Sequence, residues 1–442
     1  MKKAFVLFEL MNHMVMIAKE ARARGYEIVA LNHDPLRRSG PFAVPDGLID
    51  HLVPIESWSD SGKIQAIVDD LHRRFQIAGT YSVFDSTLHY EAALRERAGL
   101  PNNGEANLRT VLDKGAVRKK LYAEGLTGLR SMSLDEALRL DRWPFDGPAV
   151  LKPAHGTGSA LCYIVASLGE LRAAAAEARE AAVVSSIIKD YIVSHGDFVL
   201  EEKAEGELLS VESLVHRGEV RFVGLMGRYV LAKDPVVELG TLFPYNHPRL
   251  PEIVAASEAY HRSMSIFHGA THLEVMVPKE GRVELVDFNV RFAGAASLIT
   301  LGDAFGVRYE TLLTDLACGA PPDLSLVARS SRFACEMLLL PPPGATELRE
   351  LVFPPESTNR RITKDLGQRL TGRADQLDIV GMFNVTGPTA SEAHRTALDA
   401  RARTLFNGRP LGVNANNDLA FSEFMGADLE PITLGRRRSS DA

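Results

Sequence analysis

The stretch "THLEVMVPKEGRVELVDFNVRFAGAAS" covers residues 271–297 and contains two segments in which polar and apolar residues alternate. Because side chains alternate between the two faces of a strand, Asp287, Asn289 and Arg291 are expected to share one face, opposite apolar neighbours. An acid, an amide and a base in a row on one face indicate a functional site. The alternative interpretation is a surface hairpin with scattered charges.

The two segments are predicted to form a hairpin. A turn centred on residues 280–281 pairs Glu274 with Asp287 and His272 with Asn289. Two carboxylates that face each other across a ladder repel unless a cation lies between them. Mg²⁺ binds oxygen ligands of this kind, so the hairpin is a candidate metal site.

The composition is that of an ordinary globular protein with several domains. The 442 residues carry a net charge of −7, and basic residues are dispersed apart from the tail, so no nucleic-acid footprint is present. No uninterrupted apolar run is long enough to span a bilayer. Three cysteines without metal-ligand spacing fit a reducing cytoplasm. We therefore expect a cytoplasmic protein that binds small molecules, and neither nucleic acid nor membrane.

The amino-terminal segment alternates predicted strands with predicted helices. The strands are expected at residues 4–10, 26–35 and 79–85, and the helices at residues 14–25 and 64–75. This order is typical of a parallel sheet covered by helices. The first turn lacks the GxGxxG glycines that let backbone approach a pyrophosphate, which argues against a dinucleotide-binding domain. We expect an open parallel α/β domain over residues 1–103.

The middle of the chain contains longer predicted elements. One helix is expected over residues 106–125, a strand over residues 148–154, and further strands at residues 197–204, 207–216 and 219–227. The segment "DPVVELGTLFPYNHP", residues 234–248, is expected to be a proline-containing loop, and a plain surface loop is its simplest interpretation.

A glycine-bearing turn follows the strand at residues 148–154. The sequence "VLKPAHGTGSA" delivers Lys152 from an apolar strand into a turn with Gly156, Gly158 and Ser159. Successive backbone N–H groups in such a turn can bind an anion, although an ordinary glycine-rich turn has the same composition. A lysine that emerges from an apolar strand needs a negative partner. The turn is therefore a candidate phosphate site.

Two further segments carry weaker signals. Lys114 lies in the helical segment "LDKGAVRKKL", where a lysine is most simply a solvated surface residue. Glu201, Glu202 and Ala204 lie where a predicted strand leaves the core, and extended backbone there can present N–H and C=O groups to the edge of a purine. An acidic surface hinge is the alternative interpretation.

Taken in order, these motifs resemble the ATP-grasp superfamily, and within it the L-amino-acid (dipeptide) ligases. The resemblance implies an α/β (α+β) fold with an amino-terminal open parallel α/β domain, two α+β subdomains that sandwich ATP, and a small carboxy-terminal cap. The implied boundaries are residues 1–103 for the first domain, 104–199 and 200–325 for the two subdomains, 326–430 for the cap, and 431–442 for a flexible tail.

The resemblance also implies roles for individual residues. The implied ATP-binding residues are Lys114, Lys152, His155, Gly156, Gly158, Ser159, Glu201, Glu202 and Ala204. The implied ligands of Mg²⁺, or of Mn²⁺ in its place, are Glu274, Asp287 and Asn289. Arg291 is the implied catalytic residue, and the implied substrate contacts are Glu238, His272 and Gly294. Two positions depart from the family pattern: Asp287 stands where a glutamate is usual, and Leu208 stands where many members carry a ribose-binding glutamate.

The implied activity is ATP-dependent joining of a small carboxylate to an amine through an acyl phosphate, with release of ADP and phosphate. One alternative gives the acyl group to a carrier thiol or to a purine-pathway amine. Another is a non-catalytic ATP-binding regulator, which would not need a complete set of transfer residues. A homodimer is the expected assembly, since it is the commonest closed one.

Overall fold

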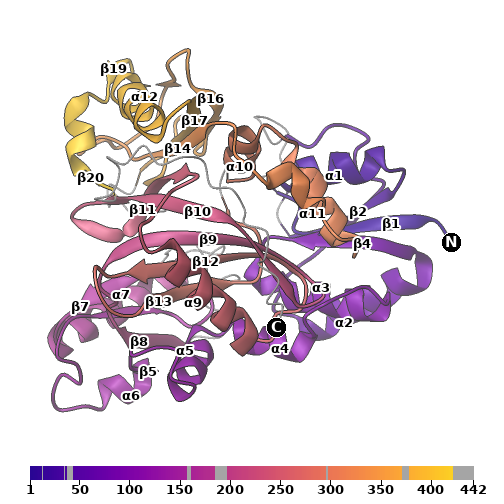
Figure 1. Ribbon diagram of the computed structural model, residues 1–442, viewed down its shortest axis with the longest axis horizontal. Coiled ribbons are helices and arrows are strands. Elements are labelled where there is room, and N and C mark those ends of the chain that lie inside the picture. The colour runs from indigo at the N-terminus through magenta and orange to yellow at the C-terminus, as the bar shows by residue number, and fades with distance from the viewer. Residues whose placement is uncertain are drawn as a thin grey trace, which may run out of the picture.

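The computed structural model describes residues 1–11, 13–33, 35–36, 43–156, 161–184, 197–294, 297–370 and 378–421. Long strands form the centre of the molecule, with the amino-terminal sheet at one end and α12 with its neighbouring strands at the other (Figure 1). Within these ranges no helix has the length and the apolar character that crossing a membrane requires.

The amino-terminal sheet has the order β3-β2-β1-β4, and all of its pairs are parallel. Its elements are β1 (Lys3–Phe8), α1 (Met14–Ala23), β2 (Glu27–Asn32), β3 (His51–Pro54), α2 (Ser61–Arg74), β4 (Gln76–Ser82) and α3 (Asp85–Arg97). The expected open parallel sheet is confirmed. The pattern did not indicate β3, because its four residues alternate between half-buried and exposed and form no apolar run.

The single helix expected over residues 106–125 is wrong, because two helices occupy this segment. They are α4 (Glu105–Val111) and α5 (Lys114–Ala123). Asp113 separates them, since its carboxylate accepts a hydrogen bond of 3.0 Å from a backbone N–H in the first turn of α5. Lys114 is therefore the first residue of a capped helix.

A small antiparallel sheet follows, with the order β5-β8-β6-β7. Its elements are β5 (Ser131–Ser133), α6 (Leu134–Leu138), β6 (Ala149–Pro153), β7 (Tyr163–Val165), α7 (Leu168–Val184) and β8 (Phe198–Glu202). Apolar side chains from α6 and α7 pack against this sheet and form its core.

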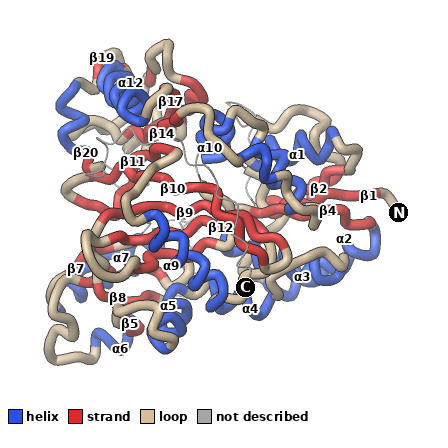
Figure 2. Tube along the Cα trace, viewed as in Figure 1, coloured by secondary structure: helices blue, strands red, loops and turns tan. Residues whose placement is uncertain are grey.

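The largest sheet runs β13-β12-β9-β10-β11-β14-β17-β16, and β20 pairs with β10 beside this path. Its first part comprises β9 (Glu207–His216), β10 (Glu219–Leu231), β11 (Asp234–Phe243), α9 (Leu250–Ser263), β12 (Gly269–Val277) and β13 (Glu284–Asn289). Helix α9 lies along this sheet (Figure 2), and its Tyr260 shares a core with Leu273 and Phe288. The apolar face of the hairpin is thereby buried.

The expected hairpin register is confirmed. Glu274 pairs with Asp287 and His272 pairs with Asn289. A register shift after Glu274 leaves these two pairs unchanged. The polar faces of β12 and β13 are consequently aligned.

The loop expected over residues 234–248 is wrong over most of its length, because β11 occupies Asp234–Phe243. The strand pairs with β10 on one side and β14 on the other. The prolines and glycine of the segment indicated a loop, but pairing on both edges outweighs that local preference. Glu238 therefore lies on a central strand.

The remaining elements complete the large sheet and cover it. They are α10 (Ser297–Phe305), α11 (Tyr309–Ala317), η1 (Leu324–Val327), β14 (Phe333–Leu339), β15 (Leu351–Val352), β16 (Thr358–Ile362), β17 (Gly381–Gly387), α12 (Ala390–Arg403), β18 (Leu405–Phe406), β19 (Arg409–Pro410), η3 (Val413–Asp418) and β20 (Leu419–Ala420). Strands β15, β18 and β19 form a separate small sheet. Because β11 pairs with β14, the large sheet contains strands from both sides of the boundary expected between residues 325 and 326. The domain boundaries stay predictions, and the expected tail at residues 431–442 lies outside the described residues.

Replacement of Gly240 by alanine tests the placement of β11. Gly240 has φ +146°, and a Cβ atom there would lie 2.1 Å from the carbonyl oxygen of Glu336 on β14. We expect Gly240→Ala to lower the free energy of unfolding by more than about 3 kcal/mol, because strain and a backbone clash combine. The control Gly344→Ala, at φ +79° with no atom within 4 Å, should cost only about 1 kcal/mol. Equal losses in denaturant titrations would contradict this placement.

Candidate active site

A cleft of about 1100 Å³ lies between the small antiparallel sheet and the large sheet. Helix α5 contributes to its wall, together with β6, β8, β11, β12 and β13. The residues singled out from the sequence that line it are Lys114, Lys152, Gly156, Glu201, Ala204, Glu238, Glu274, Asp287, Asn289 and Arg291. Leu208 lines it as well. Segments that are far apart in the sequence thus meet in one cavity.

Other predicted residues are not among those that line the cleft. They are His155, which directly precedes Gly156, and Glu202, His272 and Gly294. The Glu202 carboxylate accepts hydrogen bonds from the backbone N–H and the guanidinium of Arg130 at 2.8 and 2.5 Å. Gly294 is exposed. Gly158 and Ser159 lie outside the described residues.

Lys152 is held by a buried carboxylate. Its Nζ lies 2.5 Å from Oε1 of Glu201 and donates a 3.0 Å hydrogen bond to the carbonyl oxygen of Val286. Arg118 donates to Oε2 of the same glutamate at 3.1 Å. Burial alone would raise the pKa of Glu201, but the charges of Arg118 and Lys152 outweigh it and lower the pKa. Two cations therefore share one ionised carboxylate in the cleft wall.

Sequence reasoning missed Arg118, although a signal was available. Arg118 lies four residues after Lys114 on α5, and residues at this spacing share a helix face. A helix that presents Lys114 to the cleft must therefore present Arg118 to the same side.

Lys114 contacts the hairpin of β12 and β13 directly. Its Nζ lies 2.7 and 2.6 Å from the two carboxylate oxygens of Asp287. Burial alone would lower the pKa of Lys114, but the charges of Asp287 and Asp85 outweigh it and raise the pKa. Lys114 is charged, and it compensates one of the two facing carboxylates.

Glu274 has different cationic neighbours. Its Oε1 lies 3.5 Å from Nε2 of His272 and 3.9 Å from the guanidinium of Arg228. Burial alone would raise the pKa of Glu274, but the hydrogen bond from His272 and the charges of Arg228 and Lys114 lower it to about 2. Glu274 is therefore ionised across the physiological pH range.

His272 bridges two carboxylates. Nδ1 lies 2.5 Å from Oε1 of Glu212, and Nε2 faces Glu274. Burial alone would lower the pKa of His272, but the charge and the hydrogen bond of Glu212, with those of Glu274, raise it to about 9. The predicted substrate contact at His272 stays a prediction, while its contacts orient the Glu274 carboxylate.

Glu238 reaches the cleft from β11 and forms an ion pair with Arg228 of β10. Arg228 also donates a 2.9 Å hydrogen bond to the Ser210 hydroxyl. Sequence reasoning missed Arg228, which lies just beyond the strand expected at residues 219–227. The extension of β10 to Leu231 carries it into the sheet.

Arg291 lies at one end of the polar row. Its Nη2 donates a 2.9 Å hydrogen bond to Oδ1 of Asn289, and its Nε lies 2.9 Å from Oδ1 of Asp85. Burial alone would lower the pKa of Arg291, but the charge and the hydrogen bond of Asp85 outweigh it and raise the pKa. Asp85 is 206 positions away in the sequence, and sequence reasoning missed it.

The oxygen groups of the hairpin fit a magnesium ion. Glu274 and Asp287 are paired directly and both line the cleft, and Asn289 supplies a neighbouring amide. Within the described ranges no group of three or more His, Cys, Asp or Glu side chains is arranged for a metal. Mg²⁺ can bind through one or two carboxylates and take its other ligands from water and phosphate.

Similarity to known proteins agrees with this geometry. Residues 145–299 match the family model for the ATP-grasp domain. The chain is 25% identical over 345 residues to the alanine–anticapsin ligase of Bacillus subtilis, an alignment that covers 71% of this chain and 68% of that protein.

Solved structures share the fold. The L-amino acid ligase from Bacillus licheniformis superposes with a TM-score of 0.74 at 16% identity, covering 96% of this chain and 98% of the other. The biotin carboxylase domain of the Hydrogenobacter thermophilus 2-oxoglutarate carboxylase, solved with MgADP, superposes with a TM-score of 0.65 at 15% identity, covering 91% and 90%. The fold expected from the motifs is confirmed.

The buried carboxylate of Glu201 should stabilise the protein strongly. We expect Glu201→Gln to lower the free energy of unfolding by about 4 kcal/mol, because Lys152 and Arg118 lose their counter-charge in a buried site. The control Glu202→Gln should cause a much smaller loss, since its partner Arg130 is exposed. Thermal unfolding of both variants measures the difference, and equal losses would contradict the proposed charge balance.

The lowered pKa of Glu201 also predicts how the stability of the protein depends on pH. The folded-state pKa of Glu201 is lowered from 4.5, so the ionised carboxylate contributes its full stabilisation above pH 4.5. That contribution is lost as the pH falls through the lower folded-state pKa. The stability gap between wild type and Glu201→Gln should therefore be constant above pH 5 and close in stronger acid. A gap that widens in acid would contradict the assignment.

Proposed function

We propose that this chain, whose residues 145–299 match the ATP-grasp domain, joins the carboxylate of an amino acid or related compound to an amine, with conversion of ATP to ADP and phosphate. One observation carries the proposal. Two lysines, a pair of facing carboxylates and a buried arginine converge from separate elements on one cleft. A site that only binds ATP has no need of this complete set.

The cations of the cleft suit the phosphates of ATP. Lys114 and Lys152 both point into the cleft and would neutralise phosphate oxygens. Each of them already has a carboxylate partner, Asp287 and Glu201 respectively. These partners offset the charges of the two lysines and orient them in a buried site. Backbone near Gly156 would approach the phosphates, and Ala204 would contact the adenine.

Glu274 and Asp287, with Asn289 beside them, would hold Mg²⁺. Bound there, Mg²⁺ would neutralise charge on the phosphate oxygens and help to align them for transfer. Asp287 is within reach of Lys114 as well as of Glu274, its partner across the hairpin. Lys114 and the metal site therefore act on the same group of oxygens.

The proposed reaction has two steps. A substrate carboxylate oxygen attacks the γ-phosphorus of ATP, the bond from that phosphorus to the bridging oxygen breaks, and ADP leaves as an acyl phosphate forms. The amine nitrogen then attacks the acyl carbon, the carbon–oxygen bond to phosphate breaks, and the nitrogen loses a proton. Arg291, which is positively charged and adjoins Asn289, would stabilise the negative charge on the transferring group.

The proposed substrates are small, and one of them carries an amino group. Glu238 brings a carboxylate to the cleft from β11, where it would bind an ammonium group. The relative from Bacillus subtilis is named for alanine and anticapsin, which supports an amino-acid substrate here. His272 and Gly294 as substrate contacts, and a homodimeric assembly, stay predictions.

Product analysis tests the proposal. We expect ADP and phosphate to form from Mg-ATP only in the presence of particular amino-acid pools, and added hydroxylamine should trap the acyl phosphate as a hydroxamate. Hydroxamate without a new amide would favour an acceptor such as a carrier thiol or a purine-pathway amine. Formation of AMP and pyrophosphate, or tight ATP binding without turnover in any pool, would contradict the proposed ligase.

Replacement of Arg291 tests its part in the transfer. We expect Arg291→Ala to lower turnover at least about 100-fold, because a charge-stabilising group of the transition state is lost. MgATP binding, measured by calorimetry, should change only a few-fold. Arg282→Ala, an exposed position in the turn of the same hairpin, serves as the control with full activity. Unchanged turnover in Arg291→Ala would contradict the mechanism.

A further inference from the structure

Arg291 is held from two sides by groups of different origin. Asn289 belongs to the same hairpin, whereas Asp85 is the first residue of α3 in the amino-terminal part of the chain. The Asp85 carboxylate makes a two-point contact, with 2.9 Å from Oδ1 to Nε and 3.4 Å from Oδ2 to Nη2. A two-point contact between a carboxylate and a guanidinium fixes the plane of the guanidinium as well as its position.

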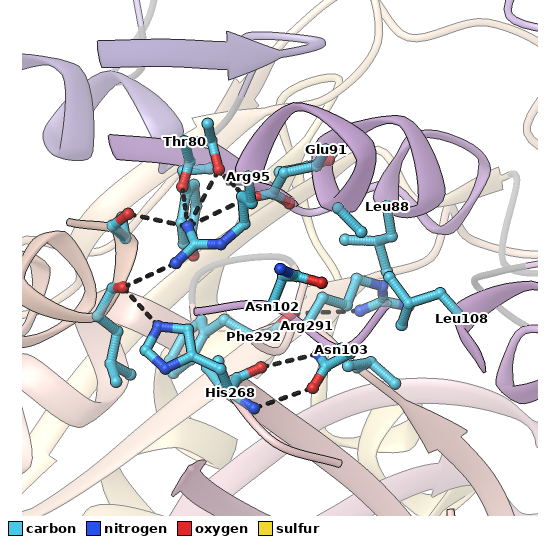
Figure 3. A pocket seen from close by; sticks show the side chains of 18 of the residues that line it. Thr80, Leu88, Glu91, Arg95, Asn102, Asn103, Leu108, His268, Arg291 and Phe292 are labelled. Carbon is cyan, nitrogen blue, oxygen red and sulfur yellow. Dashed lines mark hydrogen bonds and ion pairs between the residues drawn. The ribbon is translucent and has the colours of Figure 1, made fainter. Parts of the chain in front are cut away.

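Helix α3 is itself anchored at its other end. Arg95 donates to the Thr80 hydroxyl at 3.0 Å, to the Pro101 carbonyl at 2.7 Å and to the Ala317 carbonyl at 2.8 Å. It thereby ties α3 to β4 and to the carboxyl end of α11. In Figure 3, Arg95 and Arg291 line one cavity, which has a volume of about 570 Å³. Arg291 thus adjoins both this cavity and the cleft.

We propose that Asp85 is a positioning residue, which holds the Arg291 guanidinium in the orientation needed for phosphoryl transfer. The inference rests on the proposed function, because it presumes that Arg291 stabilises the transferring group. Its physical basis is that Arg291 is buried at a junction between two parts of the chain. Within the hairpin segment, Asn289 accepts from Nη2 and the Phe292 carbonyl oxygen accepts from Nη1 at 3.3 Å. Asp85 contacts both Nε and Nη2 through one carboxylate, and this two-point contact fixes the plane of the guanidinium.

A competing role makes the opposite prediction. If the Asp85 carboxylate merely occupied a position on Arg291 that a substrate carboxylate needs, its removal would strengthen substrate binding. The two roles therefore differ in the direction of the change in KM and kcat. Activity measurements on wild type, with the amino-acid pool that supports ADP release, provide the reference.

The test compares Asp85→Asn with Asp85→Glu and with a matched control. We expect Asp85→Asn to lower kcat about 10- to 100-fold, because a small misplacement of a catalytic group has an effect of this size. The KM for MgATP should stay unchanged, and Asp85→Glu, which restores the charge, should recover part of kcat. In an Arg291→Lys background, Asp85→Asn should have little further effect, because both changes act on the same group.

Asp315→Asn is the matched control. It breaks another contact between the amino-terminal part and α11, the 2.7 Å pair of Asp315 with Arg24. We expect it to lower thermal stability as Asp85→Asn does, and to retain full kcat. Equal loss of kcat in both variants would mean that Asp85 only docks the two parts, and would overturn the inference.

Two further outcomes separate this inference from the proposed function. If the wild type is active and Asp85→Asn keeps its kcat, or has a lower KM for the carboxylate, the inference about Asp85 is overturned and the proposed function is not. A wild type that releases no ADP with any pool overturns the proposed function, and the positioning role falls with it. A fall in kcat that Asp85→Glu partly reverses supports both.

Discussion

The structure depends on one unfavourable pairing, which is the direct opposition of Glu274 and Asp287 across a buried hairpin. Two ionised carboxylates at this distance destabilise a ladder unless cations compensate them. Lys114 compensates Asp287 and His272 compensates Glu274. Helix α5, which begins at Lys114, lies against the hairpin because its Val117 and Leu121 share an apolar core with Leu285 and Phe288. The two facing carboxylates repel each other when no cation is near, and the same arrangement suits them to bind a divalent cation.

The same balance of charge extends through the cleft. Glu201 neutralises Arg118 and Lys152 in one wall, and Glu238 forms an ion pair with Arg228 in another. Each of these cations thus has a carboxylate partner before any phosphate is considered. A phosphate group that enters meets cations that are already ordered, so less side-chain entropy is lost on binding.

Several elements departed from the pattern for physical reasons. The segment of β11 contains Pro235 and Gly240, which indicate a loop, yet strands on both of its edges make it part of the sheet. The helix expected over residues 106–125 is divided because the Asp113 side chain caps a new helix at Lys114. In the first case strands from elsewhere in the chain determine the structure, and in the second a local side-chain cap does.

The sequence by itself determined the order of the motifs, the fold class, and the register that sets Glu274 opposite Asp287. Local periodicity and the position of the turn are sufficient for the register, because they specify the face to which each side chain points. The fold class followed from the resemblance of the ordered motifs to the ATP-grasp superfamily. Only the tertiary structure decided which charges meet. Arg118 contacts Glu201 from 83 positions away along the chain, and Asp85 contacts Arg291 from 206 positions away. The packing of distant elements selects such partners, and no pattern within a single strand or helix contains that information.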